Sequence, residues 1–358
     1  MARPRIYLDH AATSPLRPEA KAAMEEGFAL WANPSSPHAE GRKAKQALED
    51  ARARVKAALE WDGEVIFTSG ASEALWIALN RAKVDRRIVS AVEHDAVFRA
   101  APDAEVLPID DHGLLQGGEL DYDALERFLS HQGRALVSVQ HINPEVGLNF
   151  YWLKEDKFQT MVAEVNALLL ADCSQSAGKI DLPNADLIVI SAHKFGGPIG
   201  AGALLVRDFS VLEPVGGHER GYRQGTENLP AILGMAAALQ CGGIEEWSTT
   251  REDRREFEKA IQQTGQLVSP GAICGTTGII AVAHPTMSAQ AQLIRLDAMG
   301  FAVSAGSACS SGTLKKSRVL DAFGVPDDIA ARTIRVSMGW STTPEELDAF
   351  AEAWRSLT

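Results

Sequence analysis

Residues 186–200 read "DLIVISAHKFGGPIG", an apolar run that ends at Ser191, His193 and Lys194 and is followed by glycines. A short apolar run bounded in this way predicts a strand buried on both faces, as in a parallel sheet. A lysine at the end of such a strand would be partly desolvated, which lowers the pKa of its amine and lets it form a Schiff base with a carbonyl compound. An ordinary surface lysine is the commoner alternative, but surface lysines rarely stand between an apolar strand and a glycine-rich turn.

Other apolar runs of similar length precede and follow this one. They are 64–70 ("EVIFTSG"), 86–92 ("RRIVSAV"), 134–140 ("RALVSVQ"), 167–173 ("ALLLADC") and 202–208 ("GALLVRD"). Helical periodicity is strong over 38–60, and helix-like stretches such as 154–166 separate the apolar runs. Strands that alternate with helices predict an α/β domain with a mainly parallel sheet flanked by helices.

The alternation stops at the glycine-rich stretch 215–230, "VGGHERGYRQGTENLP". An alanine-rich, helix-like segment follows over 231–240, and charged helix-like segments occupy 251–263 and 344–356. We therefore predict a second, smaller α+β domain. The predicted large domain spans 13–235, and the small domain combines 1–12 with 236–358.

Composition excludes several classes of protein. The formal net charge of −12 argues against a nucleic-acid partner, because phosphate binding needs clustered Lys and Arg. No apolar run approaches the roughly twenty residues of a membrane span, and the start lacks a signal-peptide pattern, so we expect a cytoplasmic protein with no membrane partner. The 4 cysteines are widely separated, so neither a disulfide framework nor a metal site is expected.

Polar side chains follow several predicted strands, at the edge where ligands bind in open α/β sheets. The turn 68–72 enters a helix and suits a phosphate, although an ordinary helix cap would look the same. Asp172 could pair with a protonated ring nitrogen, form a structural salt bridge or cap a helix. His94 could stack on a ring, act as an acid or base, or be purely structural. With the Lys194 amine, these groups make up the set that pyridoxal phosphate requires.

The stretch 304–312, "SAGSACSSG", places Cys309 among small residues. Such a segment cannot form a core, which predicts an exposed mobile loop over about 304–316. A lone cysteine is more often a small buried apolar residue than a nucleophile, so the loop alone does not decide its role.

The order of these motifs resembles the cysteine desulfurases of the NifS/IscS type, fold-type I pyridoxal-phosphate enzymes of aminotransferase class V. The likeness covers nearly the whole chain. It is carried by 7–16 ("YLDHAATSPL"), 33–44 ("NPSSPHAEGRKA"), 67–74 ("FTSGASEA"), 93–97 ("EHDAV"), 171–180 ("ADCSQSAGKI"), 191–204 ("SAHKFGGPIGAGAL"), 216–228 ("GGHERGYRQGTEN"), 304–312 and 332–339 ("RTIRVSMG").

The resemblance implies a role for each matching residue. Lys194 would hold the cofactor and move protons, Asp172 would pair with the pyridine nitrogen, His94 would stack on the ring, and Gln175 would contact the ring hydroxyl. The residues implied to bind the phosphate are Ala71, Ser72, Ser191 and His193, with Thr226 from the other subunit of a homodimer whose active sites are shared. Those implied on the substrate side are Arg335, Asn33 and Asn143.

The resemblance further implies that the chain removes sulfur from L-cysteine and leaves a persulfide on Cys309 for an iron–sulfur scaffold or another acceptor protein. Three departures from the family pattern keep alternatives open: Pro144 replaces an asparagine that contacts the ring hydroxyl, and Trp76 and Trp340 replace polar residues. The alternatives are another pyridoxal-phosphate reaction, such as a selenocysteine lyase or an aminotransferase, and a degenerate homologue that serves as a binding partner.

Overall fold

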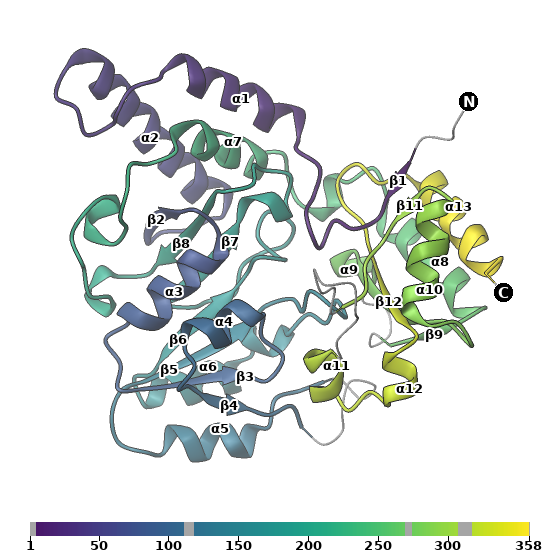
Figure 1. Ribbon diagram of the computed structural model, residues 1–358. Helices are drawn as coiled ribbons and strands as arrows, with labels where there is room; N and C mark the ends of the chain where they lie inside the picture. The colour runs from purple at the N-terminus through teal and green to yellow at the C-terminus, as the bar shows by residue number, and fades with distance from the viewer. Residues whose placement is uncertain (1–4, 111–117, 269–273, 307–316, 358) are drawn as a thin grey trace.

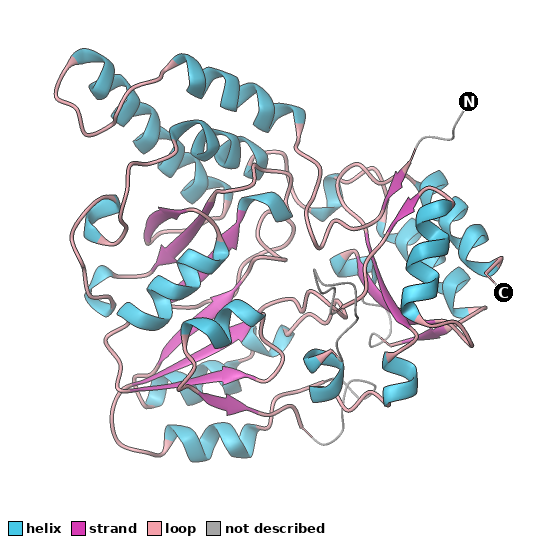
Figure 2. Cartoon of the chain, viewed as in Figure 1, coloured by secondary structure: helices cyan, strands magenta, loops and turns pink. Residues whose placement is uncertain are grey.

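The structure is a computed structural model that describes residues 5–110, 118–268, 274–306 and 317–357, without the side chains of Trp152, Lys154, Asp156 and Cys274. Cys309 and most of the predicted loop 304–316 lie outside the described residues. A large sheet with its helices occupies the left of Figure 1, and a smaller group of sheets and helices occupies the right. Figure 2 distinguishes the helices from the strands in the same view.

The large sheet has seven strands in the order β2-β8-β7-β6-β5-β3-β4. Their bounds are β2 Glu64–Thr68, β3 Arg86–Ser90, β4 Glu105–Leu107, β5 Ala135–Gln140, β6 Leu168–Asp172, β7 Leu187–Ser191 and β8 Gly202–Val206. Only β8 runs antiparallel to its neighbours within this sheet, so β2 points the same way as β7. The predicted, mainly parallel α/β sheet is confirmed, and the carboxyl ends of β2, β3, β5, β6 and β7 lie along one edge.

Helices cover both faces of this sheet because alternate strand residues are apolar on both sides. Val65 and Phe67 of β2 belong to a core layer that also contains buried residues of α2 (Ala39–Ala58), α5 (Tyr122–Leu129), α6 (Asp156–Glu164) and α7 (Leu229–Leu239). Ile66 points to the opposite face, against α3 (Ala71–Arg81) and α4 (Asp95–Ala100). The period of two along a strand therefore divides the core into two layers.

Helix α1 (Pro18–Ala29) is a helix that we did not predict. Its buried side chains are small, namely Ala20, Ala23 and Gly27, and they give no apolar stripe in the sequence. A Cβ at Gly27 would lie 2.6 Å from the Pro230 Cα, so α1 and α7 pack too closely for a larger residue there. The helix is stabilised by this close contact rather than by a large apolar face.

The second group contains a parallel pair, β1 (Ile6–Tyr7) with β11 (Phe301–Ala302), and an antiparallel sheet in the order β12-β10-β9. The remaining bounds are β9 Gln266–Leu267, β10 Ile279–Ala283, β12 Thr333–Ser337, α8 Arg251–Gln262, α9 Cys274–Thr277, α10 Ala289–Ala298, α11 Arg318–Ala322, α12 Asp327–Ala330 and α13 Pro344–Arg355. Short 3₁₀ helices cover Tyr151–Lys154, Ala192–Lys194, Phe209–Val211, Glu219–Gly221 and Ile244–Glu246. The helices predicted over 251–263 and 344–356 are confirmed.

The division into two domains stays our proposal. Helix α7 is continuous through the predicted boundary at 235 and 236, so we propose the boundary after Leu239 instead. Within the described ranges, every helix is too short or too polar to cross a lipid bilayer.

Candidate active site

A cavity of about 460 Å³ opens at the edge where the parallel strands end. Strands that are far apart in the sequence bring their polar ends to it because of the strand order. The predicted residues that line it are Ala71, Ser72, His94, Asp172, Gln175, Ser191, His193 and Lys194. The prediction that these groups share one site therefore agrees with their placement.

Lys194 lies in the 3₁₀ turn that follows β7, with its amine held by the backbone of the N-terminal segment. The Nζ atom donates to the carbonyl oxygens of Ala11 at 2.6 Å and Ala12 at 2.8 Å. Burial first, and then the Arg335 guanidinium, lower the pKa of the Lys194 amine to about 8, against the opposing effect of Asp172. The amine is therefore much closer to neutrality at physiological pH than an ordinary lysine.

This lowered pKa predicts how the ligand-free protein reacts with an acylating reagent. Only the neutral amine is a nucleophile, so we expect labelling of Lys194 to rise about tenfold per pH unit up to about pH 8 and then level off, whereas an unburied lysine levels off near pH 10.4. Brief acetylation at a series of pH values, followed by peptide mapping, measures the labelling of Lys194 and of the surface lysines, which serve as internal controls. Arg335→Gln should move the midpoint of the pH dependence of Lys194 labelling to higher pH. A midpoint near pH 10 in the unaltered protein would contradict the lowered pKa.

Asp172 ends β6 and is 6% exposed. Its Oδ1 atom accepts hydrogen bonds from the backbone N–H of Ser174 at 2.9 Å and from the Ser174 hydroxyl at 2.6 Å. These bonds fix the carboxylate in one rotamer at the cavity wall. Asp172 is therefore held by its own turn at the cavity wall, and its pairing with a ring nitrogen stays a prediction.

Gln175 is oriented by contacts on both sides of its amide. Its Nε2 atom donates to the Ala11 carbonyl at 2.8 Å, and its Oε1 atom accepts from the Lys179 amine at 3.4 Å. Lys179 is buried, which lowers the pKa of its amine to about 7. Sequence reasoning missed Lys179, and its place in "SAGK" gives no local signal of burial.

The turn from β2 into α3 forms another wall of the cavity. Gly70 has a φ of 148°, a value that favours glycine, and a Cβ on Gly202 would lie 2.7 Å from the Gly70 Cα. The N-terminus of α3, an 11-residue helix that begins at Ala71, follows this turn and lines the cavity. The Glu73 carboxylate turns back and accepts the Ser69 N–H at 2.5 Å.

His193 and His94 line two further parts of the cavity. The Nδ1 atom of His193 lies 3.0 Å from the Thr13 hydroxyl, and burial lowers the pKa of His193 to about 4. His94 caps α4 by accepting the Ala96 N–H on Nδ1 at 3.1 Å, and burial also lowers its pKa. Both imidazoles are therefore neutral near pH 7, with orientations set by their Nδ1 contacts.

Four predicted residues do not line this cavity within the described chain. Thr226 is exposed in the loop after Gly225, and Asn33 is exposed between α1 and α2, where its side chain accepts the Ser35 N–H. Asn143 is fully buried, and its Oδ1 accepts from the backbone N–H groups of residues 145 and 146. These bonds fix Asn143 in its own turn, and its predicted contact with the substrate stays a prediction.

Arg335, the fourth, lies behind the cavity wall. Its guanidinium donates to the carbonyl oxygen of Pro144 at 2.9 Å and to Asp9 Oδ1 at 2.8 Å. The Nε atom is buried without a hydrogen-bond partner among the described residues. Pro144, which departs from the family pattern, thus lines the cavity with its ring and holds Arg335 with its carbonyl.

Trp340, another departure, joins the second group of sheets to the segment before α1. Its Nε1 donates to the Pro15 carbonyl at 3.0 Å, and the Arg17 guanidinium lies 5.1 Å from the ring centroid. Arg17 also donates to the Phe195 carbonyl, next to Lys194. The tryptophan therefore supports the segment that surrounds Lys194 and does not enter the cavity.

Comparison with known proteins identifies the family. The family described as "Aminotransferase class-V" matches residues 6–350. A "Cysteine desulfurase IscS" of Dictyoglomus turgidum is 34% identical over 372 residues, which cover 96% of this chain and 92% of that protein. A solved "NIFS-LIKE PROTEIN" aligns with a TM-score of 0.84 at 27% identity over 99% of both chains. A structure titled "SspA in complex with cysteine" aligns with a TM-score of 0.75 at 26% identity, covering 94% of this chain and 100% of that one. The chain belongs to the class-V aminotransferase family, within the group whose curated relatives are named cysteine desulfurases.

Proposed function

We propose that this chain is an L-cysteine desulfurase that uses pyridoxal phosphate and carries the released sulfur on Cys309. The observation that carries the proposal is the convergence of a desolvated lysine amine, a fixed carboxylate and a helix N-terminus on one cavity. The names of the relatives point to the same reaction.

The residues around the cavity fit pyridoxal phosphate. Lys194 has the amine that a carbonyl cofactor needs, and Asp172 keeps Oδ2 available for the ring nitrogen because Ser174 occupies Oδ1. The N-terminus of α3, with Ser72, Ser191 and His193, has N–H and hydroxyl groups for the phosphate. When bound, the cofactor supplies an electron sink for bonds at the substrate α-carbon.

The chain's own residues supply proton transfer and binding. The Lys194 amine, with a pKa of about 8, can both accept and return a proton near neutral pH. The Ala11 and Ala12 carbonyls hold this amine at the cavity. Arg335, behind the cavity wall, is the residue that we assign to the substrate carboxylate, and the Pro144 carbonyl and Asp9 hold its guanidinium next to that wall.

The proposed reaction is balanced without another reactant. The C–S bond of L-cysteine breaks, the sulfur atom forms an S–S bond with the Cys309 thiol, and the carbon takes up a proton to give L-alanine. The products are alanine and an enzyme persulfide, and the proton count is unchanged. We propose a homodimer in the cytoplasm as the working form, with Thr226 entering the partner's site and an acceptor protein, such as an iron–sulfur scaffold, receiving the sulfur.

Intact-mass spectrometry after brief exposure to L-cysteine tests this proposal. We expect the mass of one sulfur atom on Cys309, located by peptide mapping, with L-alanine in solution. Cys309→Ser should bind the cofactor with unchanged absorbance but gain no sulfur. Cofactor binding without sulfur transfer in the unaltered protein would favour another pyridoxal-phosphate reaction, and the absence of cofactor binding would favour a non-catalytic binding partner.

A further inference from the structure

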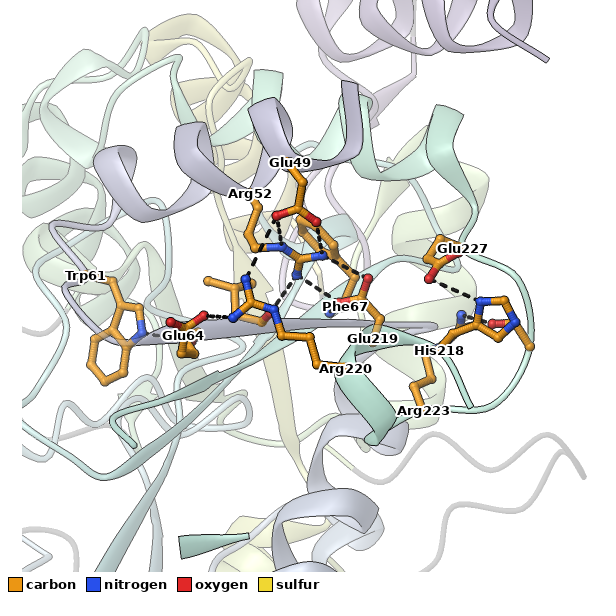
Figure 3. A network of polar contacts seen from close by, with 12 residues as sticks. Glu49, Arg52, Trp61, Glu64, Phe67, His218, Glu219, Arg220, Arg223 and Glu227 are labelled. Atoms are coloured by element: carbon orange, nitrogen blue, oxygen red, sulfur yellow. Dashed lines mark hydrogen bonds and ion pairs between the residues drawn. The ribbon is translucent and has the colours of Figure 1, made fainter. Parts of the chain in front are cut away.

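The glycine-rich loop 214–228 is anchored to the large sheet by charged side chains (Figure 3). The Glu219 carboxylate accepts from Arg52 and from the backbone N–H of Phe67 at 2.8 Å, and Phe67 directly precedes the turn 68–72. Arg220 pairs with Glu64 on β2. The base of the loop is therefore attached to the strand that leads into the cavity wall.

Arg223 connects this loop to the cavity itself. Its Nε donates to Glu73 Oε2 at 3.4 Å, and the same carboxylate oxygen accepts the Ser69 N–H at 2.5 Å. On its other side, Arg223 Nη1 donates to the carbonyl oxygens of Gly225 at 3.1 Å and Thr226 at 3.4 Å. One side chain thus contacts both the cavity turn and the exposed end of the loop.

The two ends of this connection have different environments. Glu73 lines the cavity of its own chain, whereas Gly225 and Thr226 are exposed and do not line it. The ion pair of Arg223 with Glu73 is partly shielded from solvent, because the two side chains are 16% and 29% exposed. A change in the cavity turn can therefore reach Thr226 through a single polar connection.

We propose that Glu73 and Arg223 are positioning residues that link the phosphate-binding turn of one subunit to the Gly225–Thr226 segment that it contributes to the other, so that the two cofactor sites bind cooperatively. The proposal rests on the proposed function, which supplies the cofactor and the homodimer. A phosphate bound at the turn attracts the Ser69 N–H and repels the Glu73 carboxylate that now accepts it, which strengthens the pairing of Glu73 with Arg223. Arg223 then holds Gly225 and Thr226 in place for the second site. The expected sign of the coupling is positive, since the first binding event pays the ordering cost of the second.

Titration of the dimeric apoprotein with pyridoxal phosphate, followed by absorbance, tests the link. We expect a Hill coefficient above about 1.2, with a ceiling of 2 for two coupled sites. Glu73→Gln keeps an acceptor for the Ser69 N–H but removes the charge facing Arg223, so the Hill coefficient should fall to about 1 and the apparent Kd should rise roughly fivefold. Arg223→Gln should do the same, and the double variant should be no worse than either single variant because the two residues act together.

The matched control is Arg220→Gln, which removes an ion pair from the same loop without touching the cavity turn. It should retain the Hill coefficient of the unaltered protein, whereas a merely structural role for the loop charges predicts similar losses in all variants. A Hill coefficient of 1 in the unaltered dimer, additive effects of the two substitutions, or a monomeric apoprotein would each overturn the proposal. If no Lys194-dependent absorbance develops at all, the proposed function itself fails, which is a distinguishable result.

Discussion

Replacement of Lys194 with alanine is expected to lower the rate of alanine formation from L-cysteine by at least about 10³-fold, because the variant lacks both the amine that captures the cofactor and the group that moves protons. Lys194→Arg should be equally inactive. A guanidinium keeps the positive charge in the cavity but stays protonated, so it is neither a nucleophile nor a base at neutral pH.

The fold should survive this substitution. The Lys194 amine donates to the Ala11 and Ala12 carbonyls, and the Ala11 carbonyl also accepts from Gln175. The loss of one buried hydrogen-bond donor costs about 1 kcal/mol, and the removal of a desolvated cation offsets part of that cost. Alanine formation and visible absorbance measure activity and cofactor capture, and circular dichroism checks the fold. Alanine production within tenfold of the unaltered rate would refute the role given to Lys194.

Replacement of Glu219 with alanine is expected to destabilise the protein by about 3–5 kcal/mol. The side chains of Arg52 and Glu219 are 5% and 1% exposed, and the carboxylate accepts from both terminal nitrogens of the guanidinium at 2.8 and 3.0 Å (Figure 3). Without Glu219, the hydrogen-bond partners left to the buried guanidinium among the described residues are Glu49 and the Val65 carbonyl, and the Phe67 N–H loses its acceptor.

Urea unfolding of the apoprotein at fixed protein concentration measures this loss. Glu64→Gln is the matched control, since its ion pair with Arg220 is 35–43% exposed and should contribute less than about 1 kcal/mol. Arg52→Met combined with Glu219→Gln should lose less than the sum of the single variants, because the double variant leaves no buried charge unpaired. Equal midpoints for Glu219→Ala and Glu64→Gln would show that the pair is not the stabilising contact we infer.

Elements with a strong local pattern were predictable. The apolar runs ending at Asp172 and Ser191 became buried strands, because burial on both faces selects apolar residues at every position. Strand β4 was missed, since it has three residues at the sheet edge with Glu105 and Val106 exposed. Helix α1 was missed because its contact with α7 depends on small residues rather than on an apolar stripe.

The residues of the candidate site were likewise predictable only in part. Lys194, Asp172 and His94 could be found because each follows a strand, where the chain leaves the core at the ligand-binding edge. Asp9, Lys179 and the Ala11 and Ala12 carbonyls could not, because their partners lie far away in the sequence. Lys194 and Ala11, for example, are separated by 183 residues.

The sequence by itself determined the buried strands with continuous apolar runs, the strongly periodic helices and the polar residues at the strand ends, because hydrophobic periodicity and turn chemistry are local. Only the tertiary structure decided that β8 runs against its neighbours, which brings the turn after β2 to the same edge as Lys194. It also decided that Pro144 holds Arg335 by its carbonyl and that Arg223 joins the cavity turn to Thr226. These contacts depend on strand order and on backbone atoms that every residue possesses, and neither leaves a mark in the local pattern of side chains.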